Sequence, residues 1–215
     1  MNGGLDFGRH SVAERVPASL LAALADLAKW LEAAQIPAVI IGGVASSFLG
    51  RTRLTQDVDA LAILPESKWE AATAAAQNFG IVPRIEQAIE FAHRSRVLLL
   101  KHAQSSIAID VILGGLPFEQ DAVDRAITHQ VGEISVRLPR VEDLVIMKVI
   151  AHRDKDLQDV EGLLDVHPNL NLEEIRQHVG DFAAATSMSD LIEDFERLLQ
   201  RRKSKRRPTR PPRPK

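Results

Sequence analysis

Apolar residues recur along this chain at two spacings, and each spacing predicts one kind of element. Over residues 18–34 they return every three or four positions, which predicts an amphipathic helix. Residues 38–41 are apolar without interruption, as in strands that are buried on both faces. By the same reasoning we expect strands at 58–64, 96–101, 106–113 and 134–138, and helices at 44–49, 66–78 and 118–127.

After Pro139 only the helical spacing is left. Four helices are expected there, at residues 141–152, 155–166, 172–184 and 188–201. The sequence therefore predicts an α+β chain. A small mixed β-sheet core with flanking helices would occupy residues 1–139, and a helical C-terminal part would occupy residues 140–200.

Charge sets off a third segment, residues 201–215. Nine of the 27 Lys and Arg lie there and none of the 29 Asp and Glu do, so the rest of the chain is strongly acidic. A stretch this rich in Arg and Pro cannot form a core, and we expect it to be disordered when free. Two interpretations stay open: a solubilising terminus, or an arm that binds the phosphates of RNA.

Composition excludes some kinds of site and location. The chain has no cysteine, which excludes disulfides and thiolate metal sites, so any metal must bind oxygen or histidine. Residues 1–16 contain no long apolar run, and later apolar stretches are too short or too interrupted to cross a bilayer. We therefore expect a cytoplasmic protein.

Two carboxylates stand in the second expected strand. Asp57 and Asp59 are two positions apart, so their side chains share one face of the strand, while Val58 and Ala60 face the core. Adjacent anions repel each other, and a divalent cation relieves that repulsion. Mg²⁺ prefers oxygen ligands and is commonly held by carboxylates together with substrate phosphates. The pair predicts a Mg²⁺ site, with Mn²⁺ as the alternative, and a phosphate-bearing substrate.

A third carboxylate, Asp110, interrupts the otherwise apolar run 107–113. An unpaired charge inside a core is costly, so this residue needs a partner or a function. Beside Asp57 and Asp59 it would be a third ligand of a two-metal site, or the base that activates an attacking hydroxyl. The alternative is an edge-strand carboxylate that faces solvent.

A pair of glycines, Gly42 and Gly43, lies between the expected strand 38–41 and a short helix. Glycines at a strand-to-helix turn let backbone N–H groups approach a phosphate, and the helix N-terminus adds partial positive charge. The pair is a candidate phosphate seat. Plain turn geometry is the alternative interpretation.

Two of these segments together resemble the signature of the nucleotidyltransferase superfamily that includes DNA polymerase beta and kanamycin nucleotidyltransferase. They are Ile41-Gly42-Gly43 and, after thirteen intervening residues, Asp57-Val58-Asp59-Ala60. The resemblance implies a polymerase beta-like fold in which the glycines seat nucleotide phosphates. Many relatives carry Ser or Thr directly after the glycines. Because Val44 stands there, Ser46 or the backbone alone is expected to contact the phosphate.

Two further features resemble the AbiEii-type toxins of bacterial toxin-antitoxin and phage-abortive systems. Arg53 and Thr55 precede the aspartates in that branch's R-x-T-x-D-h-D form, where they could orient phosphates. Residues 148–159 resemble its later motif, a helical Lys followed by R-x-K-D-x-x-D. The resemblance places Lys148 against the triphosphate as a catalytic residue.

The geometry of this later segment is open at the sequence level. In one continuous helix Lys148 and Lys155 would share a face and Arg153 would point away. If Asp154 caps a new helix, the three cations would gather near a helix junction and could bind nucleotide phosphates. For Lys155 the alternative is a solvated face, with Asp156 and Asp159 as surface ion-pair partners. His93, His102 and His152 show no metal-site spacing, and we interpret them as surface or incidental residues.

Together these features predict a metal-dependent nucleotidyltransferase, of EC 2.7.7 type, that moves a nucleoside monophosphate from an NTP to a hydroxyl acceptor. RNA, in particular tRNA, would fit the basic segment 201–215, and a protein side chain would fit the toxin-like relatives. A cognate toxin or antitoxin protein is a further expected partner. Two alternatives stay open: a catalytically idle regulatory module that binds a nucleotide or partner, and a structural domain whose tail binds nucleic acid.

Overall fold

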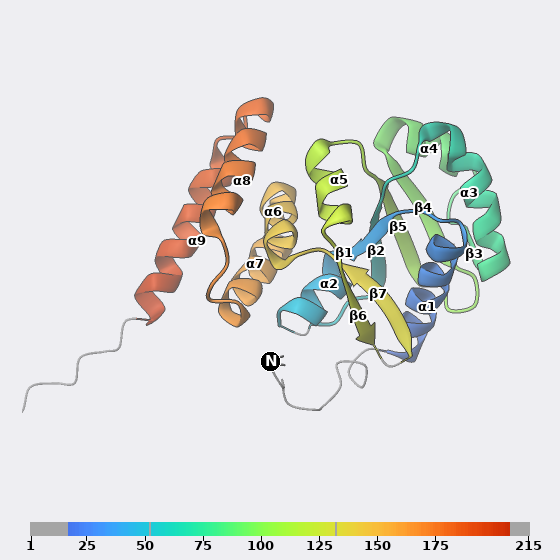
Figure 1. Cartoon of the computed structure of the whole chain (residues 1–215), viewed down its shortest axis with the longest axis horizontal. Coiled ribbons are helices and arrows are strands. Elements are labelled where there is room, and N and C mark those ends of the chain that lie inside the picture. The colour runs from blue at the N-terminus through green and yellow to red at the C-terminus, as the bar shows by residue number, and fades with distance from the viewer. Residues whose placement is uncertain (1–16, 52, 132, 207–215) are drawn as a thin grey trace, which may run out of the picture. The chain divides into compact units, whose positions relative to one another are not determined.

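The computed structural model describes residues 17–51, 53–131 and 133–206, and it divides into two compact units, Met1–Arg140 and Val141–Lys215 (Figure 1). The first unit contains a five-stranded mixed sheet with helices, and the described residues of the second are helical apart from short connections. The predicted α+β class is confirmed. No helix in the described parts of the chain is both long and apolar enough to cross a membrane. The predictions for residues 1–16 and 207–215 lie outside the described residues.

The central sheet has the strand order β1-β2-β5-β4-β3. Strands β2 and β5 are parallel, and the other neighbouring strands pair antiparallel. The strands are β1 Ala38–Ile41, β2 Asp57–Ala62, β3 Ile81–Pro83, β4 Val97–His102 and β5 Ala108–Leu113. The two strands that carry the predicted carboxylates are therefore direct neighbours inside the sheet.

Helices cover one face of this sheet closely. The helices of the first unit are α1 Ala18–Ala33, α2 Gly42–Leu49, α3 Trp69–Ala76, α4 Ala88–Ser95 and α5 Pro117–Asp124, with 3-10 turns η2 Glu66–Lys68 and η3 Gln77–Phe79. Helix α1 contacts α3 through the buried Trp30, whose indole N–H donates to the carbonyl of Ala72 (3.1 Å). It contacts β4 through Asp26, which lies 3.2 Å from the ring of the buried His102.

The two faces of the sheet differ in exposure. On β4 and β5 alternate residues such as Leu98, Leu100 and Ile109 are fully buried, on the face that includes His102. The residues between them are only half-buried, and this second face carries Lys101 and Asp110. Because side chains alternate between faces along a strand, the half-buried positions form one continuous surface. We call it the half-open face.

Several elements of the first unit differ from the predictions. The sequence gives no clear pattern for β3 or α4, since β3 has three residues and ends on Pro83, and half of the eight residues of α4 are polar or charged. The helix predicted to reach residue 127 ends at Asp124, which corrects that boundary. Strand β6, Ile127–Val131, begins at the position where that helix was expected to end, and it pairs antiparallel with β7, Ile134–Leu138. Local periodicity does not register such pairing, because it depends on the partner strand.

The second unit packs four helices around an apolar core. They are α6 Val141–Ala151, α7 Asp154–Val166, α8 Leu172–Thr186 and α9 Asp190–Arg206. Ile175 and Val179 of α8 and Leu191 and Phe195 of α9 are fully buried. The helix predicted to end at residue 201 continues to Arg206 in α9. Arg202 stabilises this extension by donating to Asp165 of α7 (3.1 Å).

Candidate functional site

The three predicted carboxylates gather on the half-open face of the sheet. Asp57 and Asp59 are half-buried residues of β2 that alternate with the fully buried Val58 and Ala60. Asp110 of β5 is level with Asp59 in the parallel register. Paired residues of neighbouring strands point to the same side. The site therefore combines two strands that are separated in the sequence by β3, β4 and their helices.

Burial and the neighbouring charges both change the pKa of Asp110. Burial raises the pKa of this carboxyl, the guanidinium of Arg84 lowers it, and the charge of Asp57 raises it again. The net effect is a pKa above the ordinary value for aspartate. A carboxylate with a raised pKa is a better proton acceptor at neutral pH than an ordinary aspartate. Asp110 is therefore suited to accept a proton from a hydroxyl.

The glycine turn lies directly against this acidic strand. Gly42 has a φ of +65°, a region that favours glycine, and a Cβ added to it would stand 1.8 Å from Oδ2 of Asp59. A Cβ on Gly43 would stand 2.5 Å from Oγ1 of Thr55. Helix α2 begins at Gly42 and not at Val44 as predicted, so both glycines belong to its first turn. The backbone N-terminus of α2 and the carboxylate strand thus form one surface.

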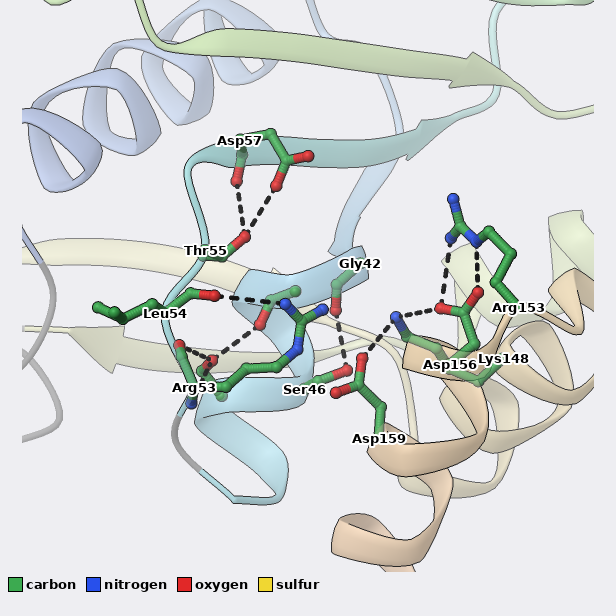
Figure 2. Close-up of polar contacts among 12 residues, drawn as sticks. Gly42, Ser46, Arg53, Leu54, Thr55, Asp57, Lys148, Arg153, Asp156 and Asp159 are labelled. Atoms are coloured by element: carbon green, nitrogen blue, oxygen red, sulfur yellow. Dashed lines mark hydrogen bonds and ion pairs between the residues drawn. The ribbon is translucent and has the colours of Figure 1, made fainter.

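The serines of α2 make internal hydrogen bonds. The hydroxyl of Ser46 donates to the carbonyl of Gly42 (2.9 Å), and the hydroxyl of Ser47 to that of Gly43 (2.9 Å). The oxygen of Ser47 also accepts the backbone N–H of Arg53 (3.4 Å), which ties the loop before β2 to the helix. Figure 2 shows Ser46 turned toward Gly42. Ser47 was not among the predicted site residues, although it fixes this loop.

Thr55 contacts a carboxylate. Its hydroxyl donates to Oδ1 of Asp57 at 2.8 Å, and Figure 2 shows the two side chains facing each other. A carboxylate with one oxygen engaged in this way has fewer orientations open to it, while its other lone pairs stay available to a ligand. Arg53, the other predicted residue of this loop, donates to the neighbouring carbonyl of Leu54 (3.4 Å).

Lys148 lies in a buried ionic cluster of the second unit. Its ammonium is 2.8 Å from carboxylate oxygens of both Asp156 and Asp159, and only 4% of its side chain is exposed. Asp156 is fully buried and also accepts a hydrogen bond from Nε of Arg153 (Figure 2). The interpretation of Asp156 and Asp159 as surface partners is therefore wrong. The sequence could not reveal this, because burial depends on how α6 meets α7.

The helix junction explains how this cluster forms. His152 has a φ of +53°, which ends α6, and α7 begins at Asp154. The chain therefore adopts the junction and not the continuous helix, which lets Lys148 reach α7. Burial raises the pKa of Asp156, but hydrogen bonds and charge from Arg153 and Lys148 outweigh it and lower the pKa overall. Arg153 is 60% exposed and Lys155 is also exposed.

The donor set of the first unit is suited to Mg²⁺ in one particular mode. No three Asp, Glu, His or Cys side chains of the described residues are grouped closely enough to hold a metal alone. Mg²⁺ at phosphate-transfer sites needs only one or two carboxylates, since water and substrate phosphates complete its shell. Asp57 and Asp59 supply that number from one face of one strand. Asp110 is held instead by Arg84, whose Nη2 lies 2.7 Å from Oδ1.

Arg84 is the main residue that the sequence analysis missed. It directly follows the three-residue strand β3, which was not predicted, and it contacts Asp110, which lies 26 positions later. No spacing rule connects residues that far apart. A surface position is wrong for His102, which is buried and lies within hydrogen-bond distance of Ser105 (2.7 Å) and Asp26 (3.2 Å) on the face opposite the aspartates.

Two solved structures of ANT(2'')-Ia share this fold at low sequence identity. The solution structure of the antibiotic-resistance factor ANT(2'')-Ia matches with a TM-score of 0.52 and 13% identity, covering 75% of this chain and 90% of that one. A crystal structure of ANT(2'')-Ia in complex with adenylyl-2''-tobramycin matches with a TM-score of 0.50 and 15% identity, covering 75% and 95%. An antigenic nucleotidyltransferase-like protein from Paracoccidioides brasiliensis matches with a TM-score of 0.46 and 15% identity, covering 87% and 94%.

A comparison with curated proteins finds no match. A family model, described as "Nucleotidyltransferase of unknown function (DUF6036)", matches residues 18–205. This range takes in the glycine turn, the three aspartates of the half-open face and the buried cluster around Lys148. The chain therefore belongs to this family of nucleotidyltransferases.

Proposed function

We propose that this protein transfers a nucleoside monophosphate from an NTP to a hydroxyl acceptor. The observation that carries the proposal is the level pairing of Asp59 with Asp110 on neighbouring strands, with Gly42 directly against Asp59. A phosphate seat and two or three carboxylates on one surface are what a nucleotidyl transfer needs. Family membership and the shared fold support the same class of reaction.

In this proposal Asp57 and Asp59 would hold Mg²⁺, and the ion would neutralise charge on the phosphates of the NTP. The backbone N–H groups of the first turn of α2 receive the phosphates, and Gly42 and Gly43 let this turn lie directly against Asp59 and Thr55. Thr55 keeps the Asp57 carboxylate in position. Ser46, Arg53, Lys148, Arg153 and Lys155 stay predictions for nucleotide binding.

Residues of the half-open face can account for each bond and proton in the transfer step. The acceptor hydroxyl oxygen forms a bond to the α-phosphorus, the bond from that phosphorus to the bridging oxygen breaks, and pyrophosphate leaves. Asp110 accepts the hydroxyl proton, which its raised pKa favours. For a third ligand role in a two-metal site, Asp110 would offer Oδ2, since Arg84 engages only Oδ1.

The identity of the acceptor is also part of the proposal. RNA, including tRNA, and a protein hydroxyl are the two predicted acceptors, and ANT(2'')-Ia adds a third class, since its structure contains adenylyl-2''-tobramycin. The resemblance to AbiEii-type toxins supports a toxin-antitoxin or phage-defence setting with a cognate partner protein. The basic segment 201–215 supports an RNA acceptor.

Label transfer tests the proposal directly. The protein is incubated with each α-labelled NTP, Mg²⁺ and, separately, total RNA, cell lysate or an aminoglycoside, and is compared with the variant Asp57→Ala/Asp59→Ala. We expect label on one acceptor class with wild type and none with the variant. If neither protein transfers label and wild type binds no NTP, the proposal is wrong, whereas NTP binding without any transfer would favour the idle-module alternative.

A further inference from the structure

Two cations lie on the half-open face, Arg84 and Lys101. Lys101 of β4 is the cross-strand partner of Ala108, and Ala108 is the partner of Asp57. The backbone N–H of Arg84 donates to the carbonyl of Leu99 (2.9 Å), the residue that faces Asp110 across the β4–β5 pair. Since cross-strand partners point to one side, both cations share the face of the aspartates.

Arg84 has hydrogen-bonding capacity beyond its contact with Asp110. Its backbone lies two strands away from Asp110, on the order of 10 Å, so the side chain extends across β4. A guanidinium has five N–H donors, and only Nη2 is engaged among the described residues, with one third of the side chain exposed. The remaining donors can bind a second anion without releasing Asp110.

Lys101 is half-buried and makes no side-chain hydrogen bond or ion pair within the described part of the chain. Its cross-strand partner is Ala108, which has a small side chain and is itself the partner of Asp57. Holding a lysine partly out of water without a partner is unfavourable. A bound anion would supply the missing partner.

The order of strands separates these cations from the glycine turn. In the order β1-β2-β5-β4-β3 the glycine turn follows β1 at one edge, and the carboxylates lie on β2 and β5. Lys101 lies on β4, and Arg84 directly follows β3 at the other edge. The NTP phosphates are proposed to bind at the glycine turn. The acceptor must approach the α-phosphorus from the side opposite the leaving pyrophosphate, which is the side of the two cations.

We propose that Arg84 and Lys101 form an acceptor-side phosphate seat and that the acceptor is a single-stranded nucleic acid. Its reacting hydroxyl lies at Asp110, and the phosphates that precede it bind the two cations. This inference rests on the proposed nucleotidyl transfer. Neither an aminoglycoside nor a protein hydroxyl has a phosphate for the seat to bind.

Salt-dependent binding tests the seat separately from catalysis. Fluorescence anisotropy measures the affinity of the full chain for a labelled single-stranded RNA 12-mer, without NTP, over a range of salt concentrations. Each lost phosphate contact lowers the slope of log affinity against log salt by about 0.7 for single strands. We expect that decrease for Lys101→Gln and for Arg84→Gln, while the control Lys68→Gln, an exposed lysine, keeps the wild-type slope.

Two further measurements show whether Lys101 binds phosphates of the acceptor or those of the NTP. NTP affinity, measured by isothermal titration calorimetry, should be the same for Lys101→Gln and wild type. A Lys101→Gln slope equal to that of Lys68→Gln, or a loss of NTP affinity in Lys101→Gln, would overturn the seat. Failure of label transfer by wild type, with the RNA slopes as expected, would count against the transfer function and not against the seat.

Discussion

Gly42 and Asp59 are in such close contact that position 42 leaves no room for a side chain. A Cβ on Gly42 would stand 1.8 Å from Oδ2 and 2.6 Å from Cγ of Asp59. Gly42 also has a φ of +65°, where residues with a Cβ are strained. The glycine turn and the acidic strand are therefore coupled, because a change in one displaces the other.

Gly42→Ala should disable the site. The left-handed φ alone costs about 1–2 kcal/mol for alanine, and the new methyl group must push the Asp59 carboxylate away. We expect a lower melting temperature and loss of NTP binding by calorimetry. Gly180→Ala is the matched control, since nothing lies within 4 Å of a Cβ there and Gly180 is inside helix α8. That control should stabilise the protein by about 0.5–1 kcal/mol. Normal NTP binding by Gly42→Ala would show that the turn is not the phosphate seat.

Thr55→Val should weaken metal binding, whereas Thr55→Ser should not. Valine has the shape of threonine but cannot donate to Asp57 Oδ1, and serine keeps the donor. A hydrogen bond to a charged group contributes about 1.5–3 kcal/mol, so we expect roughly tenfold or greater weakening. Mn²⁺ affinity in the presence of NTP, followed by electron paramagnetic resonance, measures it. Equal affinities for the two variants would mean that Thr55 does not orient Asp57.

The sequence predicts the parts of this site that depend on short spacing. Asp57 and Asp59 share a face because strands alternate, and Gly42 and Gly43 begin a helix because they follow a buried strand. Asp110 could be nominated because a charge in an apolar run is costly. Its position level with Asp59 depends on strand register, which no local pattern determines.

Residues whose role depends on a distant partner were misread or missed. Arg84 reaches Asp110 from a three-residue strand, and Ser47 holds the loop at Arg53. Asp156 appears polar and exposed in the sequence, yet the junction at His152 buries it beside Lys148. In each case tertiary packing, and not local propensity, decides the environment.

Lys148→Met should destabilise the second unit strongly. The change leaves the carboxylates of Asp156 and Asp159 buried without their shared cation, and breaking a buried ion pair in this way costs about 3–5 kcal/mol. Urea denaturation measures the loss. Lys155→Met, the same change at an exposed lysine of α7, should alter stability by no more than about 0.5 kcal/mol. Similar effects of the two variants would mean that the cluster does not stabilise the protein.

The same cluster predicts loss of stability in acid. The pKa of Asp156 is lower in the folded protein than its ordinary value of about 3.9, so ionised Asp156 favours folding at pH above that value. This contribution is lost as the pH falls through the lowered pKa. The comparison is between wild type and Asp156→Asn in urea denaturation at pH 7 and near pH 3. The stability difference between them should shrink at the lower pH, and a constant difference would contradict the assignment.

Asp110→Asn should separate stability from function. The pKa of Asp110 is raised, so the folded state holds this proton more tightly than the unfolded state does, and stability from this group falls as pH rises from the unfolded to the folded pKa. At pH 7 asparagine removes the buried charge and its repulsion with Asp57, although Arg84 loses its ionic partner. We expect Asp110→Asn to melt at or above the wild-type temperature at pH 7, and its melting temperature should rise less than that of wild type when the pH is lowered to 5.

Label transfer by Asp110→Asn should fall by about 10²-fold or more, since a positioned base contributes 10²–10⁴-fold. A variant that is both stable and fully active would exclude Asp110 as the base, whereas an unstable one would show that the Arg84 ion pair outweighs the cost of the buried charge.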